Sequence, residues 1–159
     1  MKKATFNDLI SLEYPEEFDE LSETENQKYF TGNLMRLSFL NKERHILLSL
    51  SKSKDSFMNR FVSVAAVISG SLSNMENNLK DYQHLEEYES TIFGEPSITE
   101  SFSYTANDQD VKQYGELSVF KYKKAFYVVY CISRLEDQED AKKLFKEFKD
   151  SFVAMNSAK

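Results

Sequence analysis

Apolar residues recur along this chain with two different spacings, and each spacing predicts one kind of secondary structure. Between residues 56 and 82, apolar positions follow one another at steps of three and four, which keeps them on one face of a helix. Segment 136–155 has the same spacing, and its acidic residues precede its lysines, as the helix dipole favours. The sequence therefore predicts two helices, with stripes at Phe57, Phe61, Val64, Ile68, Leu72, Met75 and Leu79, and at Ala141, Leu144, Phe145, Phe148, Phe152 and Met155.

Strict alternation of apolar and polar residues marks the strands. Segments 35–39 and 46–50 alternate on either side of a polar turn, which predicts a hairpin. Segment 84–93 is so charged that we expect it at a sheet edge, whereas segment 16–30 is at most a helical connection. The remaining predicted strands are a short one near Leu12 and Tyr14, and 97–105, 113–121 and 125–133.

This order of elements predicts an α+β fold, because consecutive hairpins build a mainly antiparallel sheet and the helices are segregated from the strands along the chain. The 159 residues are 41% hydrophobic and 14% aromatic, with four glycines and two prolines, which excludes a disordered or fibrous chain. This length is typical of one domain, and neither a repeat nor a linker interrupts it. We therefore expect a single domain over residues 1–159.

The formal net charge of −6 makes nucleic acid an improbable partner, since phosphates attract clustered bases. The charges are unevenly distributed: acids dominate 13–25 and 81–100, and bases gather in 42–60 and 121–124. Two interpretations stay open. These segments are solvated faces that keep the protein soluble, or the molecule is polarised and its acidic end meets a basic partner.

Cysteine usage and hydropathy bear on location. The single cysteine cannot form an internal disulfide. The longest apolar run, 61–72, is too short to span a membrane, and the two N-terminal lysines precede no apolar signal core. We expect a cytoplasmic protein without a membrane span, exported only if a signal segment has been trimmed from it.

The usual chemical motifs are missing from the sequence. His45 and His84 have no further ligands at zinc-site spacing, so no metal is expected. Cys131 lies within the most apolar strand and is read as a small buried residue. A calcium loop starting at Asp108 would need glycine where Gln113 stands, so segment 107–110 is read as a hairpin turn. Without a phosphate-binding loop or a catalytic triad, we expect no cofactor and no enzymatic activity.

The tyrosines of the last strands are the candidate binding residues, since tyrosine joins an apolar ring to a polar end. They are Tyr104, Tyr114 and Tyr127, to which the apolar Val129 is added. Strand 125–133 is apolar on both faces and needs two covers. If both helices lie on one face, the side with Tyr127 and Val129 is open to a partner; if they lie on opposite faces, nothing is left open.

Two residues of the first helix carry further expectations. Gly70, in mid-helix, is read as a point of close approach to the sheet, because glycine weakens a helix unless packing needs it. Leu72 is expected to face the core, so that Leu72→Asp unfolds the domain. Both expectations depend on the helix lying tightly on the sheet.

Several of these residues together resemble the PsbP-like superfamily, whose fold is shared by the yeast Mog Ran-binding protein and by bacterial secretion chaperones. The resemblance covers residues 33–153. It consists of the long helix, an acidic strand, a glycine and a proline, two tyrosine-bearing strands, a lysine-rich turn and a closing helix. The residues that carry it are Gly94, Pro96, Phe102, Tyr104, Gln113, Tyr114, Lys121 to Tyr127, Asp150, Ser151 and Phe152.

The resemblance implies an α/β/α sandwich in which an antiparallel sheet lies between helices. It also implies a non-enzymatic protein-binding or adaptor role, including that of a chaperone that shelters an apolar segment of a partner. The partner would be another protein or a second copy of this chain. No family motif assigns a functional role to a numbered residue here. The alternative class is a small-molecule-binding protein or a hydrolytic enzyme built from scattered carboxylates.

Overall fold

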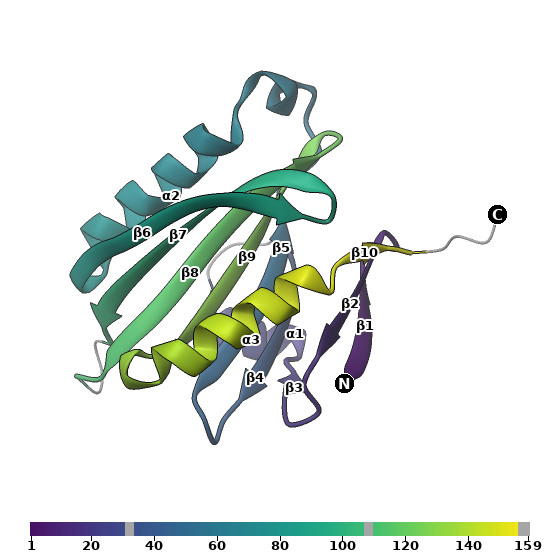
Figure 1. The fold of residues 1–159 in the computed structure, drawn as a ribbon. Helices are drawn as coiled ribbons and strands as arrows, with labels where there is room; N and C mark the ends of the chain where they lie inside the picture. The colour runs from purple at the N-terminus through teal and green to yellow at the C-terminus, as the bar shows by residue number, and fades with distance from the viewer. Residues whose placement is uncertain (31–33, 107–109, 156–159) are drawn as a thin grey trace.

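A computed structural model describes residues 1–30, 34–106 and 110–155 of the chain. Its largest element is a seven-stranded antiparallel sheet in the order β3-β4-β5-β9-β8-β7-β6 (Figure 1). The structure confirms the predicted hairpin, the predicted charged edge strand and the predicted strands at 97–105, 113–121 and 125–133, and each of them is slightly longer than predicted. The strands are β3 (Asp19–Glu20), β4 (Met35–Asn41), β5 (Ile46–Lys52), β6 (Lys80–Ile92), β7 (Glu95–Thr105), β8 (Lys112–Tyr122) and β9 (Ala125–Arg134).

A smaller sheet joins segments from both ends of the described chain. Its order is β1-β2-β10, with β1 at Lys2–Phe6, β2 at Ile10–Tyr14 and β10 at Val153–Ala154. Strand β2 was expected, but β1 and β10 were not, because their residues are mostly polar or exposed. Helices α1 (Glu23–Tyr29), α2 (Val64–Asn78) and α3 (Gln138–Asp150) complete the fold, with short 3-10 turns η1 (Phe57–Phe61) and η2 (Leu135–Asp137).

Helices α2 and α3 lie on opposite faces of the large sheet (Figure 1). On one face, Tyr127, Val129 and Cys131 of β9 pack in the cluster that contains Phe145 and Phe148 of α3. On the other face, alternate β9 residues pack in the cluster that contains Ile68 of α2; Leu21 and Phe30, which flank α1, belong to the same cluster. The α+β class and the α/β/α layering are thereby confirmed.

The expected helix over 56–82 is shorter and is interrupted. Ser56 begins η1, and the helix proper starts after Ser63, whose hydroxyl accepts a hydrogen bond from the Ala66 backbone N–H at 3.0 Å. At the other end Leu79 is extended, and β6 begins at Lys80, which pairs with Thr105 of β7. Strand pairing thus takes over the last turn that the apolar stripe had predicted as helical.

The close approach expected at Gly70 occurs at Gly115 instead. A Cβ at Gly70 would meet no atom within 4 Å, so that interpretation was wrong. At Gly115, in the middle of β8, a Cβ would lie 2.5 Å from Cζ of Phe102 and 2.8 Å from Cδ1 of Ile132. The missing side chain lets the Phe102 ring lie across β8.

The closing helix ends at Asp150, earlier than the expected Met155. The Ser151 hydroxyl donates to the Phe148 carbonyl at 2.6 Å and accepts from the Glu13 backbone N–H at 2.9 Å. These bonds end the helix and attach it to β2, so that the chain continues into β10. The predicted hairpin turn at 107–110 includes residues 107–109, which lie outside the described residues.

Candidate functional site

The four candidate binding residues divide between the two faces of the large sheet. Tyr114, Tyr127 and Val129 are at most 2% exposed beneath α3. The Tyr114 hydroxyl donates to Oε2 of Glu116 at 2.7 Å, and the Tyr127 ring stacks on Phe120. Of the two arrangements considered for the Tyr127 and Val129 side, the open one is excluded, because α2 and α3 lie on opposite faces (Figure 1) and α3 and the small sheet cover that side.

Two of the four candidates line a cavity. Tyr127, although 2% exposed, lines one of about 350 Å³ beside Asn7 and Lys124, and Tyr104 lines a larger one. Tyr104 is half-buried on the α2 face and lines a groove of about 510 Å³, which we call the Tyr104 groove. Five strands contribute to this groove, and α1 contributes Tyr29. Its lining is Tyr29, Leu40, Lys42, His45, Leu47, Tyr104, Ala106, Gln113, Tyr130, Ile132 and Arg134.

Antiparallel register arranges the lining of the Tyr104 groove in two neighbouring rows. Leu40 of β4 pairs with Leu47 of β5, and Leu47 pairs with Ile132 of β9. Arg134 follows Ile132 on β9 by two residues and so shares its face, and it begins the second row. Arg134 pairs with Gln113 of β8, and Gln113 pairs with Tyr104 of β7. Directly paired residues share a face of a sheet, so side chains distant in sequence form one continuous surface, which is apolar along the first row and more polar along the second.

Aromatic rings continue this floor toward α2. The Phe102 ring stacks with those of Tyr104 and Tyr130 at centroid distances of 6.0 and 6.2 Å, and Phe30 packs edge-on against Tyr130. Burial raises the pKa of Tyr104, and burial together with the Tyr104 hydroxyl raises that of Tyr130 well above its ordinary value. Tyrosine hydroxyls are protonated at neutral pH in any case, so both can donate hydrogen bonds within an apolar wall.

The rim of the Tyr104 groove is basic, although the whole chain carries a net charge of −6. Lys42 and His45 come from the β4–β5 turn, which Asn41 shapes by accepting the Arg44 backbone N–H on its side-chain oxygen. Arg134 ends β9 on the same groove. None of the described lining residues is acidic. The groove therefore combines an apolar floor with a positive rim.

A second groove, of about 520 Å³, lies between α2 and the strands β6 and β7. Nε2 of His84 contacts Oε1 of Glu100, whose side chain is 6% exposed. Burial raises the pKa of Glu100, and repulsion from Glu87 adds to this, while the hydrogen bond from His84 opposes it. Among the described residues, the hydrogen-bond partner of the His84 side chain is Glu100, which itself lines this groove.

Two other expectations concern reactive groups. Cys131 is 1% exposed, and burial raises the pKa of its thiol to about 12, which confirms the reading of a small buried residue. In the part of the chain that the structure describes, no group of three or more histidine, cysteine, aspartate or glutamate side chains is arranged to hold a metal ion.

Sequence reasoning found Tyr104 but missed the basic rim of its groove. Lys42, His45 and Arg134 are separated by up to about ninety residues, and only the β5–β9 pairing brings them together. His45 was weighed solely as a zinc ligand. A signal was present, since each of these bases stands just before or after an apolar strand, where a sheet exposes its ends.

Comparison with known proteins gives a likeness in structure but none in sequence. No protein-family model matches the chain, and no curated protein matches it. The protein of unknown function PA94 from Pseudomonas aeruginosa is 11% identical, with a TM-score of 0.63 over 99% of both chains. Cyanobacterial PsbP from Synechocystis is 13% identical, with a TM-score of 0.70 over 97% of this chain and 92% of that one.

LpqN, involved in cell envelope biogenesis of Mycobacterium tuberculosis, is 14% identical, with a TM-score of 0.53 over 92% of this chain and 83% of that one. These similarities, together with the layering, define the class as an α/β/α sandwich around an antiparallel sheet. Within that class the chain has the PsbP-like fold, as the residues of segment 33–153 had indicated. Among the described residues, no helix is both long and apolar enough to cross a bilayer.

Proposed function

We propose that this chain is a non-enzymatic protein-binding domain, and that its Tyr104 groove holds an apolar segment of a partner protein. The observation that carries the proposal is the apolar row Leu40, Leu47 and Ile132, which forms the floor of a groove about 510 Å³ in volume. Leu47 and Ile132 are 7% and 8% exposed at this floor, and Leu40 and Tyr104 are half-buried. A concave, mostly apolar surface with a few polar groups around it is the usual form of a binding site.

The rim of the groove narrows the chemistry of the bound segment. Lys42 and Arg134 attract carboxylates, and Arg134 can hold one with two hydrogen bonds. The protonated hydroxyls of Tyr104 and Tyr130 add neutral donors. A segment with apolar residues beside an acidic one therefore complements the groove better than a segment flanked by lysines. This role is that of an adaptor or chaperone, and we place it in the cytoplasm.

Fluorescence anisotropy with two synthetic peptides tests this proposal. Both carry the same leucine- and alanine-rich core; one is flanked by glutamates and the other by lysines. We expect tighter binding of the glutamate-flanked peptide. Tyr104→Ser should weaken the binding of both peptides, and Lys42→Glu combined with Arg134→Glu should reverse the preference between them.

Leu85→Ser is the matched control, since Leu85 is an exposed apolar residue on the edge strand β6, outside the Tyr104 groove. It should bind both peptides as the wild type does. Equal loss in Leu85→Ser and Tyr104→Ser, or no binding of either peptide, would count against the groove. Dimerisation that Tyr104→Ser abolishes, seen by sedimentation, would identify a second copy of the chain as the occupant.

The alternative, a small-molecule-binding protein or hydrolytic enzyme, is favoured by the buried Glu100 beside His84. A carboxyl with a raised pKa in a groove is the arrangement that acid–base catalysis uses. In this reading Glu100 would protonate a leaving group. A screen of ester and glycoside substrates, with Glu100→Gln and His84→Gln as controls, tests it: turnover lost in both variants would favour the enzyme.

A further inference from the structure

An exposed apolar turn precedes α2, at the end of the large sheet. Residues 57–62, which we call the aromatic hook, comprise η1 and Val62. Phe57, Met58 and Phe61 are 57%, 62% and 70% exposed, and Val62 is 38% exposed. None of these four side chains lines any of the cavities described above. The hook is thus an apolar projection, unlike the concave Tyr104 groove.

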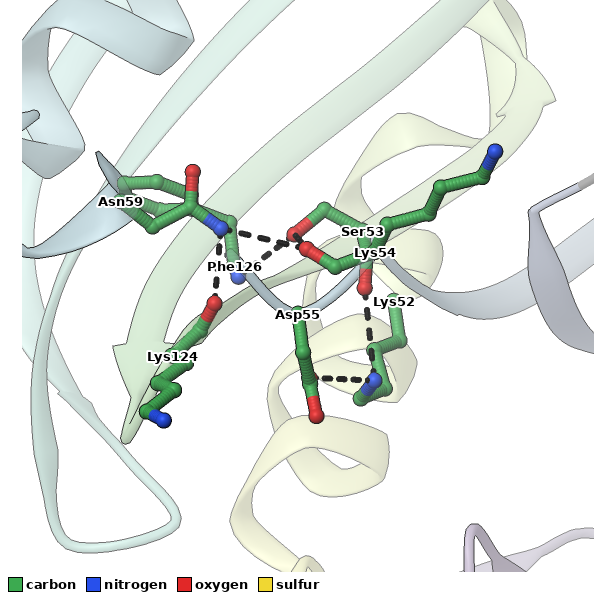
Figure 2. A network of polar contacts seen from close by, with 7 residues as sticks. All are labelled: Lys52, Ser53, Lys54, Asp55, Asn59, Lys124 and Phe126. Carbon is green, nitrogen blue, oxygen red and sulfur yellow. Dashed lines mark hydrogen bonds and ion pairs between the residues drawn. The ribbon is translucent and has the colours of Figure 1, made fainter. Parts of the chain in front are cut away.

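A polar network holds the backbone of the aromatic hook against the β8–β9 turn (Figure 2). Nδ2 of Asn59 donates to the Lys54 carbonyl at 3.2 Å and to the Lys124 carbonyl at 2.7 Å. The Ser56 backbone N–H also donates to the Lys124 carbonyl, at 3.1 Å. Nζ of Lys121 donates to the Asn59 and Val62 carbonyls.

These bonds use side chains and backbone to fix the turn, so the apolar side chains are the part of the hook that is left pointing outward. The Phe57 and Phe61 rings meet edge-on at 5.8 Å, and the Arg60 guanidinium lies over both. Holding these side chains in one conformation costs conformational entropy. Because they are exposed, burial within this chain does not offset that cost.

The fold also joins two groups of bases at the aromatic hook. Segments 52–62 and 121–126, which are distant in sequence, contain six basic residues between them and one acid, Asp55, which pairs with Lys52 at 2.8 Å. Four of these bases have exposed side chains: Lys54, Arg60, Lys123 and Lys124. This end of a chain with a net charge of −6 is therefore positive.

We propose that the aromatic hook docks this protein on the surface of an anionic lipid bilayer. Phe57, Met58 and Phe61 insert between headgroups, and the surrounding lysines and Arg60 contact lipid phosphates. Protruding rings beside bases are the combination that interfacial binding needs, because apolar insertion and attraction to anionic lipids reinforce each other. A protein partner would need a matching concave surface to bury these projecting side chains, whereas the headgroup layer of a bilayer needs none. This inference does not depend on the function proposed for the Tyr104 groove.

Vesicle co-sedimentation of the full chain tests the hook. One set of vesicles is phosphatidylcholine alone, and the other is equal parts phosphatidylcholine and phosphatidylglycerol. We expect binding to the anionic vesicles that falls as salt is raised, and little binding to the neutral ones. Phe61→Ser should weaken binding about tenfold. Lys54→Glu with Lys124→Glu should weaken it at least about tenfold.

Both sets of substitutions leave the network of Figure 2 in place, since Lys54 and Lys124 enter it through their carbonyl groups. Val153→Ser is the control, an apolar residue of β10 that is 54% exposed and should bind as the wild type does. Binding that is equal on both vesicles, or unaffected by Phe61→Ser, would overturn the proposal. So would self-association that Phe61→Ser abolishes, because the hook would then be a protein contact.

Discussion

Lys149 of α3 and Glu116 of β8 form an ion pair inside the protein, with Nζ 3.2 Å from Oε1 and both side chains 6% exposed. Nζ of Lys149 also donates to the hydroxyls of Tyr88 and Ser118, and Tyr114 donates to the other oxygen of Glu116. Burial alone would lower the pKa of Lys149, but attraction to Glu116, joined by Tyr88 and Cys131, outweighs burial and raises that pKa. The ion pair thus fixes how α3 lies on the sheet.

Removing one partner of this pair should be far more damaging than removing both. Lys149→Met leaves Glu116 charged and buried, and should cost about 3–5 kcal/mol of unfolding free energy in urea titrations. Adding Glu116→Gln should restore most of it, since the glutamine can still accept the Tyr114 hydrogen bond. Lys146→Met, which breaks an exposed pair with Asp150, is the control and should change little. A double variant as unstable as Lys149→Met would contradict this account.

Replacing Gly115 and Gly70 by alanine should change the stability of the protein in opposite directions, because Gly115 is tightly packed and Gly70 is not. Gly115→Ala places a Cβ 2.5 Å from the Phe102 ring and should cost about 1–3 kcal/mol through overpacking. Gly70→Ala, exposed in the middle of α2, should stabilise the protein by about 0.5–1 kcal/mol. Thermal melts of the two variants against wild type measure both effects. A destabilised Gly70→Ala would mean that something packs against that position after all.

The stability of the protein should depend on pH through Glu100. Because its pKa in the folded protein is raised above the ordinary value of 4.5, the carboxyl favours the folded state below that value. This contribution is lost as the pH rises through the folded pKa. Glu100→Gln should therefore be more stable than wild type at neutral pH, with the difference shrinking on acidification. His84→Gln, measured alongside, shows how much of the effect comes from the contact between His84 and Glu100. A difference between Glu100→Gln and wild type that grows in acid would contradict this account.

Helix α2 is attached to the sheet chiefly through Ile68, which is 3% exposed and is the buried residue of that helix. Ile68→Ala should cost about 2–5 kcal/mol. Leu72 is half-buried and lines the open groove beside β6, so the aspartate of Leu72→Asp can reach water. Its cost should be about 1–2 kcal/mol, and it should leave the protein folded. Urea unfolding followed by circular dichroism compares them; unfolding by Leu72→Asp would support the deeper burial first expected.

Periodicity predicted the inner strands β4, β5, β7, β8 and β9 well, because each of them has a paired strand on both sides in the large sheet. The alternation in 125–133 has a direct cause, since Tyr127 and Val129 face α3 while Val128 and Tyr130 face the other layer. The same pattern could not say which layer each helix joins. That choice depends on contacts between Phe145 and the sheet, which no local spacing encodes.

Helix ends and the basic rim of the groove were harder to predict for different reasons. The stripe from Phe57 to Leu79 is continuous in sequence, yet the hydrogen bond that the Ser63 hydroxyl accepts from Ala66 and the strand pairing at Lys80 set the true limits of α2. Ser63 could not be identified as the start of the helix from the sequence, because other serines precede it and any of them could cap a helix. The meeting of Lys42 with Arg134 requires the order of strands β4, β5 and β9, which is a property of the whole sheet.

The small sheet makes the order of synthesis matter for this protein. Strand β10 lies beside β2 (Figure 1). Ser11 of β2 pairs with Val153 of β10, and the Met155 backbone N–H donates to the Leu9 carbonyl at 2.9 Å. The β1–β2 hairpin is synthesised well before β10, so the second edge of β2 stays unpaired until β10 has been made. Its apolar face, which includes Ile10 and Leu12, stays uncovered by α3 until then. Contacts of such long sequence separation slow folding, and a nascent chain stalled before α3 would present this hairpin to chaperones and proteases.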